Sequence, residues 1–214
     1  MAISEKAQQI INQIGGESTK LGDIRKIAKE VKKDHALAME LWSTGNFFAM
    51  QLAILILEKK ELNQALIDQM DADIQKHPSK QRDHLTDWLM ANQLMKDKNL
   101  VALLETWEDS PSPLQRRIFW YYQARLRWTG KTPIDNADYL LTNIEAKIEN
   151  EAPEVQWAMN FLAGQIGVFD ESRRAQCIQM GEKLGLYSDE VAPKGCTPNY
   201  LPEFIRIEVE KRKK

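Results

Sequence analysis

Apolar residues recur at helical spacing along nearly the whole chain of 214 residues, and this periodicity constrains the fold more than any other feature. Runs in which apolar and polar residues alternate, which would predict strands, are nearly absent. Glycine (10 residues) and proline (8 residues) are scarce, and many of them punctuate the periodic segments. The sequence therefore predicts an all-α fold.

We expect about eleven helices followed by a final amphipathic stretch. Asn46 and Ser112 are candidate N-caps, Pro113 suits the first helical position, and Gly130 and Gly185 would each end a helix. Helix pairs recur at roughly 35–40 residues, as in two-helix solenoid repeats, so we predict one solenoid domain over residues 1–214. The expected helices cover residues 2–14, 20–33, 34–43, 47–60, 62–76, 81–96, 98–108, 113–129, 136–150, 154–167, 171–185 and 201–212.

Composition excludes several classes of protein. Apolar residues make up 43% of the chain and charged residues 28%, as in ordinary globular proteins, and the net charge is −2. Cys177 and Cys196 form no paired motif, so we expect neither a disulfide framework nor a structural zinc site. The N-terminus lacks the apolar core of a signal peptide, and the longest apolar run, residues 52–57, is too short to cross a bilayer. We expect a soluble, reduced, cytoplasmic protein.

Charge is segregated along the chain. Residues 110–134 contain five cations and no acid, residues 20–34 six cations and three acids, and residues 138–154 five acids and one lysine. A solenoid with one basic face and one acidic face fits this pattern, and clustered Lys and Arg are typical of phosphate binding. Solvated helix faces would give the same pattern, so that alternative stays open.

The basic segment 110–134 also contains interleaved aromatic residues. Arg117, Trp120 or Tyr121, and Trp128 fall on one helical stripe, which could present guanidinium and aromatic groups to a phosphate backbone or an unstacked base. The alternative is that the aromatic side chains are core and the arginines pair with acids. Arg116 and Arg117 lie in the first helical turn, where an anion is favoured and a cation costs stability, which favours a functional role.

A second group of candidates lies in residues 84–97. His84, Trp88 and Asn92 share one helix face, so a buried Asn92 there must find hydrogen-bond partners, either as a clamp between helices or as a ligand contact. The three histidines show no metal-ligand spacing, and the chain has no phosphate-binding glycine loop and no nucleophile motif. We therefore expect no metal and no cofactor.

Four stretches together resemble the DNA alkylation repair family, the HEAT-like-repeat 3-methyladenine and 7-methylguanine DNA glycosylases. The stretches are residues 21–57, residues 87–94, residues 107–110 with 114–117, and residues 155–167 with 194–205. The resemblance implies a HEAT-like solenoid whose concave basic surface holds duplex DNA. It also implies excision of N3- or N7-alkylated purines without a metal or cofactor, with a carboxylate that stabilises the oxocarbenium-like sugar.

The resemblance also assigns residues. Trp88 matches the family's first aromatic residue, Arg116 or Arg117 its phosphate-clamping arginine, and Asn160 lies near its C-terminal aromatic position. Asn92 occupies the position of the catalytic Asp, and the missing charge would cost about 3–4 kcal/mol in barrier, roughly a hundred- to thousandfold in rate. The residues expected to bind DNA are Trp88, Arg116, Arg117, Trp120, Tyr121, Arg125, Trp157 and Asn160.

Our main hypothesis is therefore a DNA-binding protein of this family with weak or absent glycosylase activity, whose partner is duplex, damaged or branched DNA. One alternative is an active glycosylase that uses a carboxylate from another helix. The other alternative is a helical-repeat scaffold for an unidentified protein partner, which would dock on the acidic segment 138–154.

Overall fold

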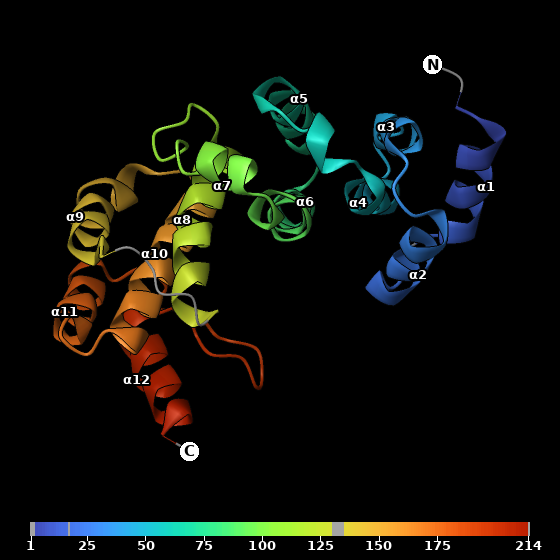
Figure 1. Ribbon diagram of the computed structural model, residues 1–214. Helices are drawn as coiled ribbons and strands as arrows, with labels where there is room; N and C mark the ends of the chain where they lie inside the picture. The colour runs from blue at the N-terminus through green and yellow to red at the C-terminus, as the bar shows by residue number, and fades with distance from the viewer. Residues whose placement is uncertain (1–2, 17, 130–134, 214) are drawn as a thin grey trace. The chain divides into compact units, whose positions relative to one another are not determined.

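The computed structural model describes residues 3–16, 18–129 and 135–213 (Figure 1). Over these residues the chain forms twelve α-helices, three short 3₁₀ helices and no strand, so the all-α prediction is confirmed. None of the described helices combines the length and the apolar character needed to cross a membrane. The helices are α1 (Glu5–Ile14), α2 (Leu21–Val31), α3 (His35–Ser43), α4 (Phe47–Ile56), η1 (Lys59–Glu61), α5 (Gln64–Ile74), α6 (Ser79–Asn92), η2 (Leu94–Lys96), α7 (Lys98–Leu104), α8 (Pro113–Trp128), α9 (Ala137–Lys147), η3 (Ile148–Asn150), α10 (Pro153–Phe169), α11 (Arg174–Leu184) and α12 (Leu201–Arg212).

The contacts between helices group into two compact units, Met1–Thr106 and Trp107–Lys214. The single domain predicted over residues 1–214 stays a prediction. Two predicted features lie outside the described residues: the helix stop at Gly130, and Lys131 of the basic segment. Helix α8 ends at Trp128, close to the predicted end.

In the first unit, α2, α4 and α6 lie side by side, with α1, α3 and α5 in a second layer (Figure 1). The side chain of Asn46 caps α4 by accepting hydrogen bonds from the backbone N–H groups of Phe48 and Ala49. Most of α4 is buried, because α2, α3 and α6 cover it on several sides. This apolar helix is the centre of the first unit's core.

Helix α4 ends earlier than the sequence predicts, at Ile56 and not near residue 60. The Lys33 ammonium donates hydrogen bonds to the carbonyls of Leu55 and Leu57, both at 2.8 Å. The Gln93 side chain donates to the carbonyl of Ile54. These distant side chains satisfy carbonyls that another helical turn would otherwise satisfy, so the helix stops without a local signal.

In the second unit, α8, α10 and α12 lie side by side, and α9 and α11 pack against this layer (Figure 1). Glycines bring the helices close together: a Cβ atom at Gly164 would lie 2.8 Å from the Phe204 ring, and one at Gly167 would lie 2.6 Å from Ile205 Cδ1. Because a real Cβ atom does not tolerate such distances, these glycines set how closely α12 packs on α10.

Candidate nucleic-acid interface

The residues predicted to form the site fall into two groups, one in each unit. Trp88 and Asn92 lie on α6 in the first unit. The second unit contains the remaining candidates, which lie on α8 and α10: Arg116, Arg117, Trp120, Tyr121, Arg125, Trp157 and Asn160.

Trp88 is held in place on several sides. Its indole Nε1 donates a hydrogen bond to the carbonyl of Gln51 on α4 at 3.1 Å. Its ring stacks on His84, with 5.8 Å between the ring centroids and 20° between the planes. The guanidinium carbon of Arg25 on α2 lies 5.1 Å from the indole centroid, which is a cation–π contact. With these neighbours only 8% of Trp88 is exposed.

The contact between Arg25 and Trp88 was not predicted from the sequence. The two residues belong to different helices, and only a resemblance over residues 21–57 singled out the arginine-containing helix. No local pattern reports a contact between α2 and α6, because it depends on how both helices flank α4.

His84 is half-buried beside Trp88, and burial lowers the pKa of its imidazole below the ordinary value of 6.5, with the charge of Asp87 acting in the opposite direction. The rings of Phe47 and His84 pack edge to face, with 5.5 Å between their centroids and 63° between their planes. The Nε2 atom of His84 has no hydrogen-bond partner among the described residues. His84 is therefore a neutral ring at neutral pH, and it supports Trp88 by stacking.

Asn92 ends α6, and its side chain turns back along its own helix. Its Nδ2 donates a hydrogen bond to the carbonyl of Trp88, one turn earlier, at 2.9 Å. The side chain is half-buried. An amide in this position holds the helix end but carries no negative charge with which to stabilise a cationic sugar.

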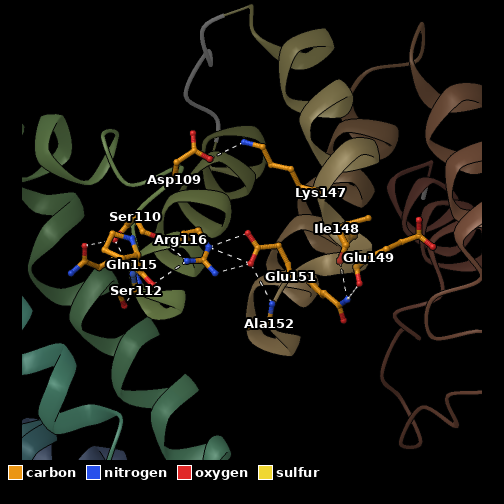
Figure 2. A network of polar contacts seen from close by, with 12 residues as sticks. Asp109, Ser110, Ser112, Gln115, Arg116, Lys147, Ile148, Glu149, Glu151 and Ala152 are labelled. Carbon is orange, nitrogen blue, oxygen red and sulfur yellow. Dashed lines mark hydrogen bonds and ion pairs between the residues drawn. The ribbon is translucent and has the colours of Figure 1, made fainter.

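Arg116 forms a fork with Glu151 at the start of α8 (Figure 2). Its Nε and Nη2 donate to the two carboxylate oxygens of Glu151 at 2.8–3.2 Å, and its Nη1 donates to the carbonyl of Ser110 at 2.6 Å. The exposed fractions of the two side chains are 19% and 14%. This pair joins the basic segment to the acidic one.

Arg117 points into the second unit, where only 4% of it is exposed. Its guanidinium carbon lies 4.6 Å from the centroid of the Trp157 ring, and its Nη1 donates to the carbonyl of Glu154 at 3.0 Å. Arg117 therefore joins α8 to the first turns of α10. The phosphate-clamping role that the resemblance implies for Arg116 or Arg117 stays a prediction.

Half-buried aromatic rings continue from this point along α8 and α10. Trp157 and Phe161 are stacked, with centroids 5.1 Å apart and planes 7° apart. Tyr121 contacts Trp157 at 5.6 Å, and Trp128 contacts Phe161 at 5.3 Å. The guanidinium carbon of Arg125 lies 5.2 Å from the Trp128 centroid. We call these five residues the α8–α10 aromatic surface.

Trp120 and Asn160 lie inside the second unit. Trp120 is 1% exposed and packs edge-on against Phe119, with centroids 5.0 Å apart. Asn160 is also buried, and its Nδ2 donates to the carbonyl of Asn199 at 2.8 Å, which ties α10 to the segment before α12. Both side chains serve packing in this structure, and a contact with DNA stays a prediction for each.

The fold and the family of this chain are both represented among known proteins. A solved structure with a TM-score of 0.70 comes from work on "a new family of proteins related to the HEAT-like repeat DNA glycosylases with affinity for branched DNA structures". The two chains are 19% identical, and the match covers 98% of this chain and 90% of the other, which shows a shared HEAT-like helical-repeat fold. The DNA alkylation repair enzyme family matches residues 17–183, and the chain belongs to that family. No curated protein matches the chain.

Proposed function

We propose that this protein binds DNA and has weak or absent glycosylase activity. The observation that carries the proposal is the α8–α10 aromatic surface, in which partly exposed rings lie beside the guanidinium of Arg125. Aromatic side chains bind nucleic acids by stacking on bases, and an adjacent arginine adds attraction to the phosphates and to the rings. The affinity of the structurally similar protein for branched DNA supports this reading, because a branch point exposes bases that a continuous duplex stacks.

The second part of the proposal rests on Asn92. Base excision needs negative charge beside the developing oxocarbenium ion, and a preorganised charge of this kind accounts for about 3–4 kcal/mol of the barrier. Asn92 supplies an amide, and that amide is occupied by the carbonyl of Trp88. We infer that the scaffold binds DNA while base release is slow or absent.

Substitution of Trp128 tests the binding surface. We expect Trp128→Ala to weaken binding to a labelled four-way junction by about 1–3 kcal/mol, as for the loss of one stacked base. Tyr139→Ala is the matched control, because Tyr139 is an aromatic residue of the same unit that is 57% exposed and lies on α9. Equal affinities for the two variants, or a wild-type affinity that hardly changes with salt, would contradict the proposal.

Substitution of Asn92 tests the chemistry. We expect Asn92→Asp to raise the rate of 7-methylguanine release, by up to about a hundredfold, and Asn92→Ala to leave it unchanged. The unfolding free energy of both variants is measured alongside, because each loses the hydrogen bond to the Trp88 carbonyl. An Asn92→Asp protein of wild-type stability with no gain in release would show that Asn92 is not what limits excision.

A further inference from the structure

Helix α2 presents cations along one exposed face. Arg25, Lys26 and Lys29 are exposed, whereas Ile24 and Ile27 are buried. At 100° per residue, the three cations fall within an arc of about 100°, opposite the two isoleucines. The basic face of α2 therefore points to solvent while its apolar face anchors the helix in the first unit.

These cations form no ion pair in the described part of the chain, although Asp23 and Glu30 lie on the same helix. Within residues 3–16, 18–129 and 135–213, no carboxylate pairs with Arg25, Lys26, Lys29 or Lys32, the last of which is the exposed C-cap of α2. Other exposed lysines do have carboxylate partners: Lys60, for example, lies 2.9 Å from Glu58. Unpaired charges that are held on one helix raise the local positive potential and attract a polyanion.

One of the four cations also contacts the aromatic residue that the sequence singled out. The Arg25 guanidinium lies over the Trp88 ring at 5.1 Å, so the basic face of α2 reaches across to α6. Stacking restricts the guanidinium while leaving its N–H groups able to donate. Gly22 lies on the same face, and nothing is found within 4 Å of the Cβ that a side chain would add there, so another molecule can approach the helix closely.

We propose that the basic face of α2, formed by Arg25, Lys26, Lys29 and Lys32, binds the phosphate backbone of duplex DNA. This inference rests on the proposed DNA-binding function and names where the backbone is held in the first unit. Arg25 and Lys32 are separated by about 10 Å along the helix at 1.5 Å per residue, and duplex DNA carries one charge per about 1.7 Å of axis. Flexible lysines can therefore reach successive phosphates, and such contacts position DNA without reading its sequence.

The test compares two variants with the same change in net charge. The α2 variant carries Lys26→Gln, Lys29→Gln and Lys32→Gln. The control carries Lys60→Gln, Lys76→Gln and Lys183→Gln, three exposed lysines that are paired with carboxylates. Affinity for a labelled 30-base-pair duplex is measured between 50 and 200 mM salt. Each lost phosphate contact lowers the salt slope by about 0.9, so the α2 variant should lose between two and three units and the control much less than one.

The outcomes distinguish the role of α2 from the proposed function. Equal slopes for the α2 variant and the control, with a steep wild-type slope, would overturn the role of α2 and leave the proposed function standing. A wild-type protein that binds no duplex and no junction would overturn the proposed function itself. If the α2 substitutions abolish binding to phosphatidylserine vesicles while DNA binding is unchanged, the face binds lipid and the proposal is wrong. Circular dichroism confirms that the variants remain helical.

Discussion

Helices α8 and α2 both carry clustered cations, but they use them differently. The segment around α8 has the larger excess of positive charge in the sequence, yet Arg116 is paired with Glu151 and Arg127 donates to the Gln123 carbonyl and to Asn136. The exposed cations of α2 have no acidic partner in the described residues. A charge count along a sequence thus does not measure the charge that a ligand can reach. Paired arginines join helices of the second unit, whereas the cations of α2 are exposed.

The largest effect should come from breaking the Arg116–Glu151 pair. We expect Arg116→Ala to lower the free energy of unfolding by about 3–5 kcal/mol, because it leaves a mostly buried carboxylate without its partner. Lys29→Ala on α2 should change it by no more than about 0.5 kcal/mol. Urea unfolding measures both.

A double variant sharpens this prediction. Removing Glu151 together with Arg116 should cost less than the sum of the two single substitutions, as expected for coupled residues. An Arg116→Ala protein of wild-type stability whose salt slope for DNA falls by about one would instead make Arg116 a phosphate-binding residue, and the contrast with α2 would disappear.

The next largest difference in stability should come from replacing a glycine by alanine in each unit. At Gly181 an added Cβ would lie 2.6 Å from Leu201 Cβ, so Gly181→Ala should destabilise the second unit by about 1–3 kcal/mol. At Gly22 on α2 the space is open, and alanine should be neutral or stabilise by up to about 1 kcal/mol. Thermal unfolding measures the stability of both variants. A loss of stability in Gly22→Ala would mean that other residues cover this face of α2.

The smallest effect is a pH dependence that arises beside Trp88. Because the pKa of His84 is lowered in the folded state, the unfolded chain binds more protons just below the ordinary value of 6.5. Stability should therefore fall as the pH drops from about 6.5 through the folded pKa, and His84→Gln should flatten this part of the curve. Urea unfolding at several values between pH 7 and pH 5 measures it. An unchanged profile in His84→Gln would assign the dependence to other groups.

The sequence predicted most of the helices, because each amphipathic helix carries its own apolar period. The helix over residues 201–212 matches α12, and that over 113–129 nearly matches α8. It failed at the end of α4, where Lys33 and Gln93 supply hydrogen bonds from elsewhere in the fold. Long-range partners of this kind leave no trace in the residues next to the helix end.

The site was predictable only in part. The spacing of Trp88 and Asn92 indicated that they share a helix face, and the hydrogen bond between them agrees. The exposure of the stripe that included Trp120 was not predictable, because periodicity tells which residues share a face but not whether solvent reaches that face. Trp120 is buried. The contact between Arg25 and Trp88 depends on packing between helices and could not be predicted.

DNA binding without base excision is tested most directly by measuring base release from methylated duplex DNA with excess protein, with binding followed in the same samples. We expect the protein to bind this DNA with an affinity that falls steeply with salt, and to release little or no 7-methylguanine or 3-methyladenine. Rapid release of either base would contradict it, because a carboxylate other than the one missing at position 92 would then have to perform the chemistry.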